Sequence, residues 1–412
     1  MFTSHLHDPK DLRYSFYVVW FDALASLNRE YALLYYTVDN TVEMIDRKTK
    51  KTFLKRSSYP DVKLENLFVG STIVIFGRQL KIVEYADQAT REALTKAKEH
   101  AFILVRPEAF VHSGEILNIF HQNKLIVAKL KTAFLSDEEA EKLFDCRMYT
   151  SGSASSISSS PQSSRSPLTP YSPHYAEYCA SASCGLCLAM ELVGCSAISL
   201  LQELVGNPSF EQAKRENPKS LIARFGKGES RPGLYVSPTL EKSKMDSELI
   251  LDIPRMPTAQ LRDCTTALVY PHAINEGKLG PIIQEILDKG FIISCISHFQ
   301  LNKSTAGEFF EVYETVIPEY PHIVDEACNG LCVAMEVVLS EDLKSKDSGD
   351  ADIVQLFRDL CGPADPVVAK TLRPHSLRAM FGNTRVQNAI HCTDLSEDGV
   401  LESEYFFSIL QE

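Results

Sequence analysis

One stretch near the C-terminal end of the sequence carries residue types that can do chemistry at close spacing. His391 lies between Asn388 and Thr393, and two arginines, Arg358 and Arg378, precede it. A neutral imidazole can attack a terminal phosphate and form a covalent intermediate. Arginine forks can hold phosphate oxygens while Mg²⁺ bridges them. The pattern therefore predicts phosphoryl transfer. A lone histidine in a loop is nevertheless more often a hydrogen-bonded structural residue, and on these residues alone that interpretation stays open.

The composition limits the class of protein that positions these residues. The chain has 412 residues, which suggests two or three domains, and its 42 basic and 54 acidic side chains give a net charge of −12. This balance argues against broad affinity for DNA, RNA or anionic membranes. No run approaches about 18 apolar residues, and the start lacks the pattern of a secretory signal. Eleven cysteines, an odd number, favour reduced thiols. We expect a soluble intracellular protein.

Internal repeats are the most informative feature of the sequence. The run from Cys184 to Glu191 (CGLCLAME) recurs from Asn329 to Glu336 (NGLCVAME), and residues 220–226 match residues 376–382. Equivalent positions are separated by 145 to 164 residues and keep their order. One domain is therefore duplicated, with insertions of different length in each copy. We expect the two copies to pair with each other inside the chain.

Each copy has the pattern of a strand, a turn with proline, an amphipathic helix and further strands and helices, which predicts a ferredoxin-like α+β sandwich. Before the copies, the first 90 residues contain short β-branched and aromatic runs between turn residues, as in a small antiparallel sheet. Residues 151–173 are almost pure Ser, Pro and small residues and form an insertion inside the first copy. Residues 227–262 carry Gly, Pro and mixed charges and are interpreted as a linker.

The stretch around His391 resembles the active loop of the nucleoside diphosphate kinase family, which reads Asn-x-x-His-Gly-Ser-Asp. The resemblance covers both copies, and the N-terminal runs, such as Trp20-Phe-Asp22 and Arg29-Glu-Tyr31, resemble the DM-ten domain of ciliary proteins. It implies an α+β chain in which a small β-rich DM-ten domain is followed by two tandem ferredoxin-like (βαββαβ) kinase-like domains. The implied boundaries are 1–95 for the DM-ten domain, 101–250 for domain A with a Ser-rich insertion at 148–176, and 263–408 for domain B.

Site roles are implied residue by residue. His391 matches the phosphorylated histidine, and Thr393 and Glu402 match the residues that support it. The nucleotide-binding residues implied by the resemblance are Asn388 for the sugar hydroxyl, Arg358 and Arg378 for the phosphates, Tyr320 near the residue that stacks on the base, and Phe310 in place of an active-site tyrosine. Mg²⁺ would accompany the nucleotide, and no protein metal site is expected.

Departures from the family pattern predict weak chemistry. The lysine that meets the transferring phosphate is replaced by Tyr270, a loss on the order of 10²–10³ in rate. Ala364 replaces a threonine of the nucleotide loop, and Cys392 replaces the glycine after the histidine. In the first copy, alignment places Tyr235 at the histidine position and Arg106 at the lysine position. The other matches there are Pro232 for Asn388, Gln202 for Arg358 and Ile222 for Arg378. Domain A is predicted to be inactive, and whether domain B is weakly active stays open.

Two functions compete. The three-domain resemblance implies a structural protein, a microtubule inner protein of ciliary and flagellar axonemes. Its expected partners are tubulin, other axonemal proteins and the γ-tubulin complex, and its expected locations are the cytoplasm, cytoskeleton, axoneme, centrosome and basal body. The alternative is an active ATP-binding kinase that moves the terminal phosphate of nucleoside triphosphates to nucleoside diphosphates through phosphohistidine at His391. The basic run Arg47–Arg56 is either a solvated hairpin edge or a docking surface for an acidic partner such as tubulin.

Two further motifs carry less weight. Cys184 and Cys187 have C-x-x-C spacing, but a zinc site needs a second pair, so buried structural thiols are expected. Four Ser-Pro or Thr-Pro dipeptides in the Ser-rich tract are either phosphorylation sites or simply part of a solvated segment.

Overall fold

The computed structural model describes residues 13–22, 25–60, 62–144, 175–346 and 352–411. The chain divides into two compact units. The first contains the chain up to Lys98 together with Gln300–Leu331, and the second contains Glu99–Phe299 and Cys332–Glu412. The segment 151–173 and its phosphorylation motifs lie outside the described residues. Of the predicted insertion 148–176, only Tyr175 and Ala176 are described, and they begin helix α4.

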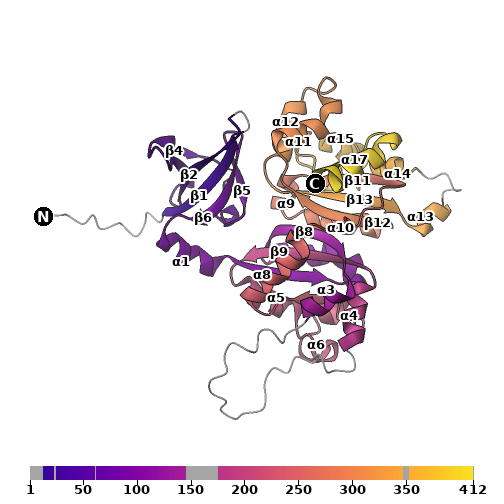
Figure 1. Cartoon of the computed structure of the whole chain (residues 1–412). Coiled ribbons are helices and arrows are strands. Elements are labelled where there is room, and N and C mark those ends of the chain that lie inside the picture. The colour runs from indigo at the N-terminus through magenta and orange to yellow at the C-terminus, as the bar shows by residue number, and fades with distance from the viewer. Residues whose placement is uncertain (1–12, 23–24, 61, 145–174, 347–351, 412) are drawn as a thin grey trace, which may run out of the picture. The chain divides into compact units, whose positions relative to one another are not determined.

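The first unit contains a six-stranded antiparallel sheet (Figure 1), which confirms the small sheet predicted from the sequence. Phe16, Val18, Leu33 and Met44 alternate with more exposed neighbours and form its buried face, as expected for half-buried strands. The strand order is β4-β3-β2-β1-β6-β5. Its elements are β1 (Arg13–Asp22), β2 (Leu27–Tyr36), β3 (Thr41–Asp46), β4 (Thr52–Ser58), β5 (Thr72–Ile75), β6 (Arg78–Tyr85) and helix α1 (Gln88–Ala97).

The same unit includes a helical segment from within the second copy. It consists of α11 (Lys303–Phe309), a 3₁₀ turn at Glu311–Tyr313 and α12 (Tyr320–Ala327). Asn302 begins α11 with a capping box, because its side chain accepts from the amide of Thr305 while Thr305 Oγ1 accepts from the amide of Asn302. This segment carries Phe310 and Tyr320.

The second unit is built on one eight-stranded sheet with the order β10-β7-β9-β8-β12-β13-β11-β14 (Figure 1). Each half contributes four strands. From either edge of the sheet inward, these are the fourth, first, third and second strands of that half in chain order, which is the ferredoxin-like order. The duplication therefore appears as two matching half-sheets joined through their second strands. The strands are β7 (Glu99–Val105), β8 (Ile126–Phe134), β9 (Leu186–Gly194), β10 (Leu234–Val236), β11 (Cys264–Val269), β12 (Phe291–Phe299), β13 (Cys332–Leu339) and β14 (Ile390–Cys392).

The halves also meet through one helix from each. Helix α2 (Ser113–Gln122) packs against α10 (Leu279–Asp288) at Gly114 and Gly280. A Cβ atom at Gly280 would lie 2.6 Å from both the amide of Asn118 and the carbonyl oxygen of Gly114. At the strand junction, the amide of Ile296 donates to Thr132 Oγ1 at 2.9 Å. The halves thus pair inside the chain, as the duplication led us to expect.

The predicted linker at 227–262 is wrong. This range contains β10, helix α8 (Leu240–Ser247) and a π-helical turn at Glu248–Asp252. Gly233 takes a φ of 85° just before β10, and Ser237, Lys242 and Asp246 are buried and bond to one another inside the fold. The remaining helices are α3 (Asp137–Phe144), α4 (Tyr175–Ser183), α5 (Ala197–Val205), α6 (Phe210–Glu216), α7 (Leu221–Phe225), α9 (Pro271–Asn275), α13 (Glu341–Lys346), α14 (Ile353–Cys361), α15 (Pro366–Leu372), α16 (Leu377–Phe381) and α17 (Gly399–Phe407).

None of the helices in the described part of the chain is long and apolar enough to cross a membrane.

Candidate functional site

His391 is the middle residue of the short edge strand β14. It pairs with Leu268 of β11, and its side chain is 5% exposed. Ala389, two residues earlier, has a φ of 75°, a left-handed conformation that a non-glycine residue seldom adopts. The turn that brings the chain into β14 is therefore strained directly beside the histidine, as is common at functional sites.

A carboxylate and a hydroxyl hold the imidazole. Glu402 of α17 lies with Oε2 3.0 Å from His391 Nε2, and Thr393 Oγ1 donates to the same oxygen at 2.9 Å. The amide of Thr266 donates to Thr393 Oγ1 at 3.1 Å, so β11 fixes the hydroxyl in turn. Because an ionised carboxylate only accepts, Nε2 must carry the proton. In that tautomer Nδ1 has the lone pair and is the nucleophilic nitrogen.

The surroundings also change the acidity of the imidazole. Burial disfavours the charged ring and is the largest single influence. The charge and hydrogen bond of Glu402, with smaller contributions from Cys392 and Asp394, nevertheless raise the pKa of His391 above its usual 6.5. The neutral, nucleophilic form therefore accumulates only as the pH rises through this elevated pKa.

We expect Glu402→Gln to lower the pH at which His391 becomes reactive. An amide keeps a hydrogen-bond acceptor but removes the negative charge that stabilises the imidazolium, so the midpoint of the pH–rate profile should move down, together with a lower plateau. The measurement is the rate at which γ-labelled ATP phosphorylates His391 between pH 5 and 9. Because wild-type transfer is expected to be slow, it is repeated in the Tyr270→Lys background. Glu404→Gln, on the same helix, is the matched control, and an unchanged midpoint in Glu402→Gln would contradict the assignment.

Both predicted phosphate-binding arginines lie close to β14. Arg358 of α14 donates from Nη1 to the carbonyl oxygen of Asp394 at 2.7 Å, and its side chain is 41% exposed. Arg378 of α16 is buried and donates from Nε to the carbonyl oxygen of Ile390 at 3.0 Å. The Arg358 guanidinium is thus anchored through Nη1 while the side chain remains partly exposed, whereas Arg378 is held inside the protein.

Asn388 is the residue whose surroundings best suit a ligand. It is 8% exposed, and its Nδ2 donates to the carbonyl oxygen of Ala364 at 3.4 Å. Its Oδ1 is buried and accepts no hydrogen bond from the described residues. A buried acceptor without a donor is unfavourable, so this oxygen suits a ligand hydroxyl that would supply one.

The loop that follows α14 presents Ala364 to this asparagine. Gly362 begins the loop with a φ of 77°, where a Cβ atom would meet the side chain of Ser376. Asp365 then caps α15 by accepting from the amide of Val367 at 2.9 Å. The loop is thus held at both ends by contacts that only Gly and a capping residue satisfy.

Tyr270 occupies the position where the resemblance predicts a lysine. It follows β11, and its amide donates to the carbonyl oxygen of Ala389 at 3.1 Å, which places it next to the turn into β14. Its side chain is 3% exposed. A buried phenol supplies no positive charge here.

The structure brings together six of the eight predicted site residues in the second unit: His391, Thr393, Glu402, Arg358, Arg378 and Asn388. The other two lie in the first unit. Phe310 follows α11 and is fully buried, with its ring 4.8 Å from that of Phe309. Tyr320 begins α12, and its hydroxyl donates to the carbonyl oxygen of Gly307 at 3.3 Å. Their roles toward a nucleotide stay predictions.

The first half of the sheet repeats the arrangement with different residues. Tyr235 of β10 pairs with Leu104 of β7, as His391 pairs with Leu268. The Tyr235 hydroxyl donates to Asp246 Oδ2 at 3.0 Å, and Ser237 Oγ donates to the same oxygen at 2.6 Å. Lys242 forms a buried ion pair with Asp246. The triad of ring, hydroxyl and carboxylate is therefore retained, without the imidazole.

Sequence reasoning missed Ser237 and Asp246. The signal was present, because Tyr235-x-Ser237 followed by Asp246 has the same spacing as His391-x-Thr393 followed by Glu402. It was obscured because all three side chains differ between the copies.

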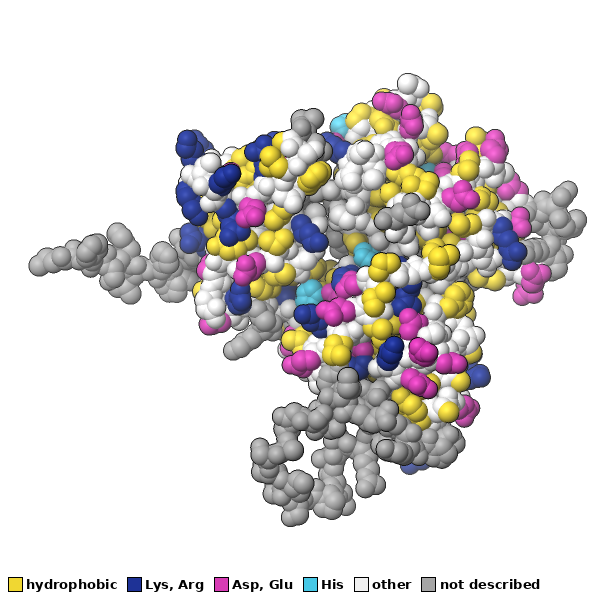
Figure 2. All heavy atoms as spheres, viewed as in Figure 1, with side chains coloured by type: hydrophobic (Ala, Val, Ile, Leu, Met, Phe, Trp, Pro, Cys, Tyr) yellow, Lys and Arg dark blue, Asp and Glu magenta, His cyan; other side chains and the backbone are white. Residues whose placement is uncertain are grey.

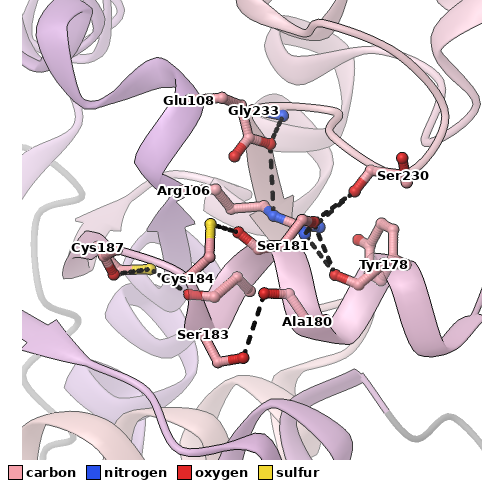
Figure 3. Close-up of polar contacts among 12 residues, drawn as sticks. Arg106, Glu108, Tyr178, Ala180, Ser181, Ser183, Cys184, Cys187, Ser230 and Gly233 are labelled. Atoms are coloured by element: carbon pink, nitrogen blue, oxygen red, sulfur yellow. Dashed lines mark hydrogen bonds and ion pairs between the residues drawn. The ribbon is translucent and has the colours of Figure 1, made fainter.

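Arg106, at the lysine position of the first half, is enclosed by residues of that half (Figure 3). It is fully buried, and Nη2 donates to the carbonyl oxygen of Tyr178 at 2.6 Å and to Ser181 Oγ. Its guanidinium lies 4.2 Å from the ring centroid of Tyr178, and Glu108 Oε1 lies 3.5 Å from Nε. Carbonyl, hydroxyl and carboxylate oxygens of this half thus surround the Arg106 guanidinium, although its Nε and Nη1 make no hydrogen bond within the described residues.

The C-x-x-C motif next to this cluster does not form a metal site. Cys187 is buried and donates to the carbonyl oxygen of Ala182 at 3.3 Å, whereas Cys184 is exposed. The expectation of buried structural thiols is therefore right for Cys187 and wrong for Cys184. Within the described ranges, no group of three or more His, Cys, Asp or Glu side chains is placed to hold a metal ion.

Two family models match parts of the chain. A family model described as the nucleoside diphosphate kinase 7 N-terminal PH domain matches residues 8–96, and one described as nucleoside diphosphate kinase matches residues 263–411. Nucleoside diphosphate kinase homolog 7 of Rattus norvegicus is 38% identical over 402 residues, which cover 97% of this chain and 93% of the relative. The homolog 7 protein of Mus musculus is 37% identical over the same shares of the two chains.

More distant relatives match one third of the chain. The nucleoside diphosphate kinase of Aquifex aeolicus is 31% identical over 147 residues, covering 36% of this chain and 95% of the relative. A crystal structure of the Aquifex aeolicus kinase covers 36% of this chain and 96% of its own, at 30% identity and a TM-score of 0.31.

Proposed function

Since this chain belongs to the nucleoside diphosphate kinase homolog 7 family, we propose that it is a structural, microtubule-associated protein of ciliary and flagellar doublet microtubules. In this proposal the kinase fold serves as a scaffold. Residues 101–250 are a degenerate kinase-like domain A without activity, and domain B, residues 263–408, binds nucleotide with weak or absent phosphotransfer. The proposal rests on the combination of a β-rich N-terminal domain with two kinase-like copies.

The scaffold function is supported by a contrast in the first half, which keeps the fold of the kinase-like copy but not its nucleophile. This half keeps its four strands in the shared sheet, but Tyr235 stands in place of the nucleophile and Arg106 is buried against protein oxygens. A site without its nucleophile cannot run the reaction of the family. A half that only packs against the second copy or binds a partner needs to keep its fold but not its catalytic residues.

The N-terminal sheet offers a surface for an acidic partner. Figure 2 shows Lys and Arg side chains gathered over the part of the sheet that β3 and β4 form. Lys48, Lys51 and Lys55 are exposed, while the Arg47 and Arg56 guanidinium groups lie 3.8 and 3.9 Å from the ring centroids of tyrosines on the outer face. Stacked arginines are held in place, so binding immobilises less side chain. In a chain of net charge −12, this basic hairpin, Arg47–Arg56, is our candidate tubulin surface.

Charge reversal of this hairpin tests the proposal. We expect the triple variant Lys48→Glu, Lys51→Glu and Lys55→Glu to weaken microtubule binding by on the order of tenfold or more at low salt, because opposite charges across the contact become like charges. Cosedimentation with purified microtubules measures it. The matched control reverses three exposed lysines of the second unit, Lys142, Lys219 and Lys244. Equal binding by wild type and the hairpin variant would remove the hairpin from the proposal.

Location in cells is a second readout of the same proposal. The tagged wild-type chain should mark axonemes and basal bodies in ciliated cells, and the hairpin variant should mark them less. A diffuse cytosolic signal for wild type would count against the ciliary function and against tubulin, axonemal proteins and the γ-tubulin complex as partners.

An active domain B is the second candidate function, favoured by the geometry at His391. Glu402 selects the tautomer in which Nδ1 can attack the terminal phosphate of a nucleoside triphosphate, which breaks the bond to the bridging oxygen and releases a nucleoside diphosphate. A second nucleoside diphosphate then takes the phosphate from Nδ1 and leaves the histidine free. Asn388 Oδ1 would accept a hydrogen bond from the sugar hydroxyl, and the exposed guanidinium of Arg358 would bind a phosphate. Mg²⁺, when bound with the nucleotide, would neutralise phosphate charge. The buried acceptor on Asn388 fits such a ligand.

A further inference from the structure

Two cysteines and an arginine form a buried cluster directly beside His391. Cys392 of β14 is 1% exposed, Cys361 at the end of α14 is fully buried, and both thiols lie next to Arg378 of α16. We propose that Cys392 is present as a thiolate that neutralises Arg378 and thereby weakens the hold of domain B on nucleotide phosphates. This inference rests on the proposed function in one respect, namely that domain B binds a nucleotide.

The hydrogen bonds of Arg378 direct one of its nitrogens to the Cys392 sulfur. Nε donates to the carbonyl oxygen of Ile390 at 3.0 Å and Nη1 to that of Gly362 at 2.8 Å. Nη2 points to Cys392 Sγ at 3.5 Å. Two neutral carbonyl groups thus fix the plane of the guanidinium, and among the described residues Cys392 is the only sulfur or carboxylate acceptor of Arg378.

Electrostatics agree with this geometry. A hydrogen bond from Cys361 is the largest influence on Cys392, and the positive charge of Arg378 acts in the same direction, so the pKa of Cys392 falls to about 6 although burial opposes this. Burial raises the pKa of Cys361 well above its ordinary value, and the hydrogen bond and charge of Cys392 act in the same direction. The other ionisable groups that act on the cluster are His391 and Asp394, from β14 and the loop after it, and Tyr270, at the start of α9.

The pairing changes the net charge that Arg378 presents to a nucleotide phosphate. A bare guanidinium attracts an anion, but a guanidinium already paired with a thiolate presents almost no net charge. In the related active loop this position holds glycine, which has no charge to offer. Removing one opposing charge a few ångströms from a phosphate should strengthen phosphate binding by on the order of tenfold at the dielectric of a partly buried site. Cys392 is thus a positioning residue acting through Arg378.

The test uses the full chain with Mg-ADP as the probe, titrated by calorimetry at pH 7.5. We expect Cys392→Ser and Cys392→Gly to bind Mg-ADP about tenfold more tightly than wild type. Cys295→Ser is the matched control, because Cys295 is equally buried but accepts from the Thr132 hydroxyl rather than from an arginine. Affinities equal to wild type in both Cys392 variants, or no binding by any of them, would overturn the inference.

The pH dependence distinguishes a charge effect from a packing effect. Below pH 6 the thiolate is protonated in wild type, so its affinity should approach that of Cys392→Ser, and the tenfold difference should close by pH 5. A difference that stays constant across this range would contradict the thiolate.

A readout without nucleotide separates this inference from the proposed function. The difference in absorbance at 240 nm between wild type and Cys392→Ser should report one thiolate at pH 7.5, lost with a midpoint near pH 6. Arg378→Met should move that midpoint upward. If no thiolate is found, the inference fails even when the kinase or scaffold function holds. If the thiolate is present but Mg-ADP does not bind, the nucleotide part of the proposed function fails with it, while tubulin binding is untouched.

Discussion

Tyr270→Lys should raise phosphotransfer through His391 by on the order of 10²–10³-fold. Tyr270 directly follows β11 and lies beside the turn that precedes β14, since its amide donates to the carbonyl oxygen of Ala389. A lysine there would supply the positive charge that the family uses against the transferring phosphate. The phenol of Tyr270 is buried and neutral, so it cannot offset charge that develops on the phosphate during transfer.

Acid-labile labelling of the purified chain by γ-labelled ATP measures this effect, with exchange between nucleoside di- and triphosphates as the second assay. Tyr270→Phe is the matched control, because it removes the hydroxyl without adding a cation and should give no gain. His391→Ala in the lysine background should abolish the label. If Tyr270→Lys gives no gain, the missing lysine is not the main defect. Robust labelling of wild type that His391→Ala abolishes would instead defeat the scaffold-only function.

The crossing of α2 and α10 should be highly sensitive to added bulk. We expect Gly114→Val and Gly280→Val each to destabilise the second unit by about 3 kcal/mol or more, because the new side chain would overlap backbone atoms that cannot move independently. The expected result is a melting temperature lower by several degrees in either variant. The two costs should not add, since the first substitution already separates the helices.

Thermal unfolding followed by circular dichroism measures both variants and the double variant. Gly307→Ala is the control, because a Cβ atom there meets only the Tyr320 hydroxyl at 3.6 Å and alanine favours the helix. Wild-type melting in Gly280→Val would mean that the two halves do not pack through these helices. Fully additive losses would mean that the two glycines do not share one contact.

Much of the fold was predictable because repeats and periodicity are local properties of a chain. The recurrence of GLC-x-AME and of the Ser-Leu-x-Ala-x-Phe-Gly segment indicated a duplication, and alternating apolar residues indicated the N-terminal sheet. Spacing within one loop was equally informative. Asn388, His391 and Thr393 lie close together in sequence, so they stay near one another in any fold.

The linker at 227–262 shows where local reasoning fails. Its Gly, Pro and charged residues are typical of an exposed connection, yet Ser237, Lys242 and Asp246 are buried. Tertiary contacts overrode composition, because the ion pair of Lys242 with Asp246 and the hydroxyl groups around it satisfy one another inside the fold.

The sequence by itself determined that the same motifs recur in the same order in two copies, that the second copy has a histidine with its supporting residues, and that the first copy lacks the histidine. These conclusions need only residue identity and order. The tertiary structure alone decided that the two copies share a single sheet, that Arg106 is buried against Tyr178 and Ser181, and that Cys392 is paired with Arg378 beside His391. The physical reason is that charge pairing and packing depend on distance in space, and residues such as Cys361 and Cys392 come close only after folding.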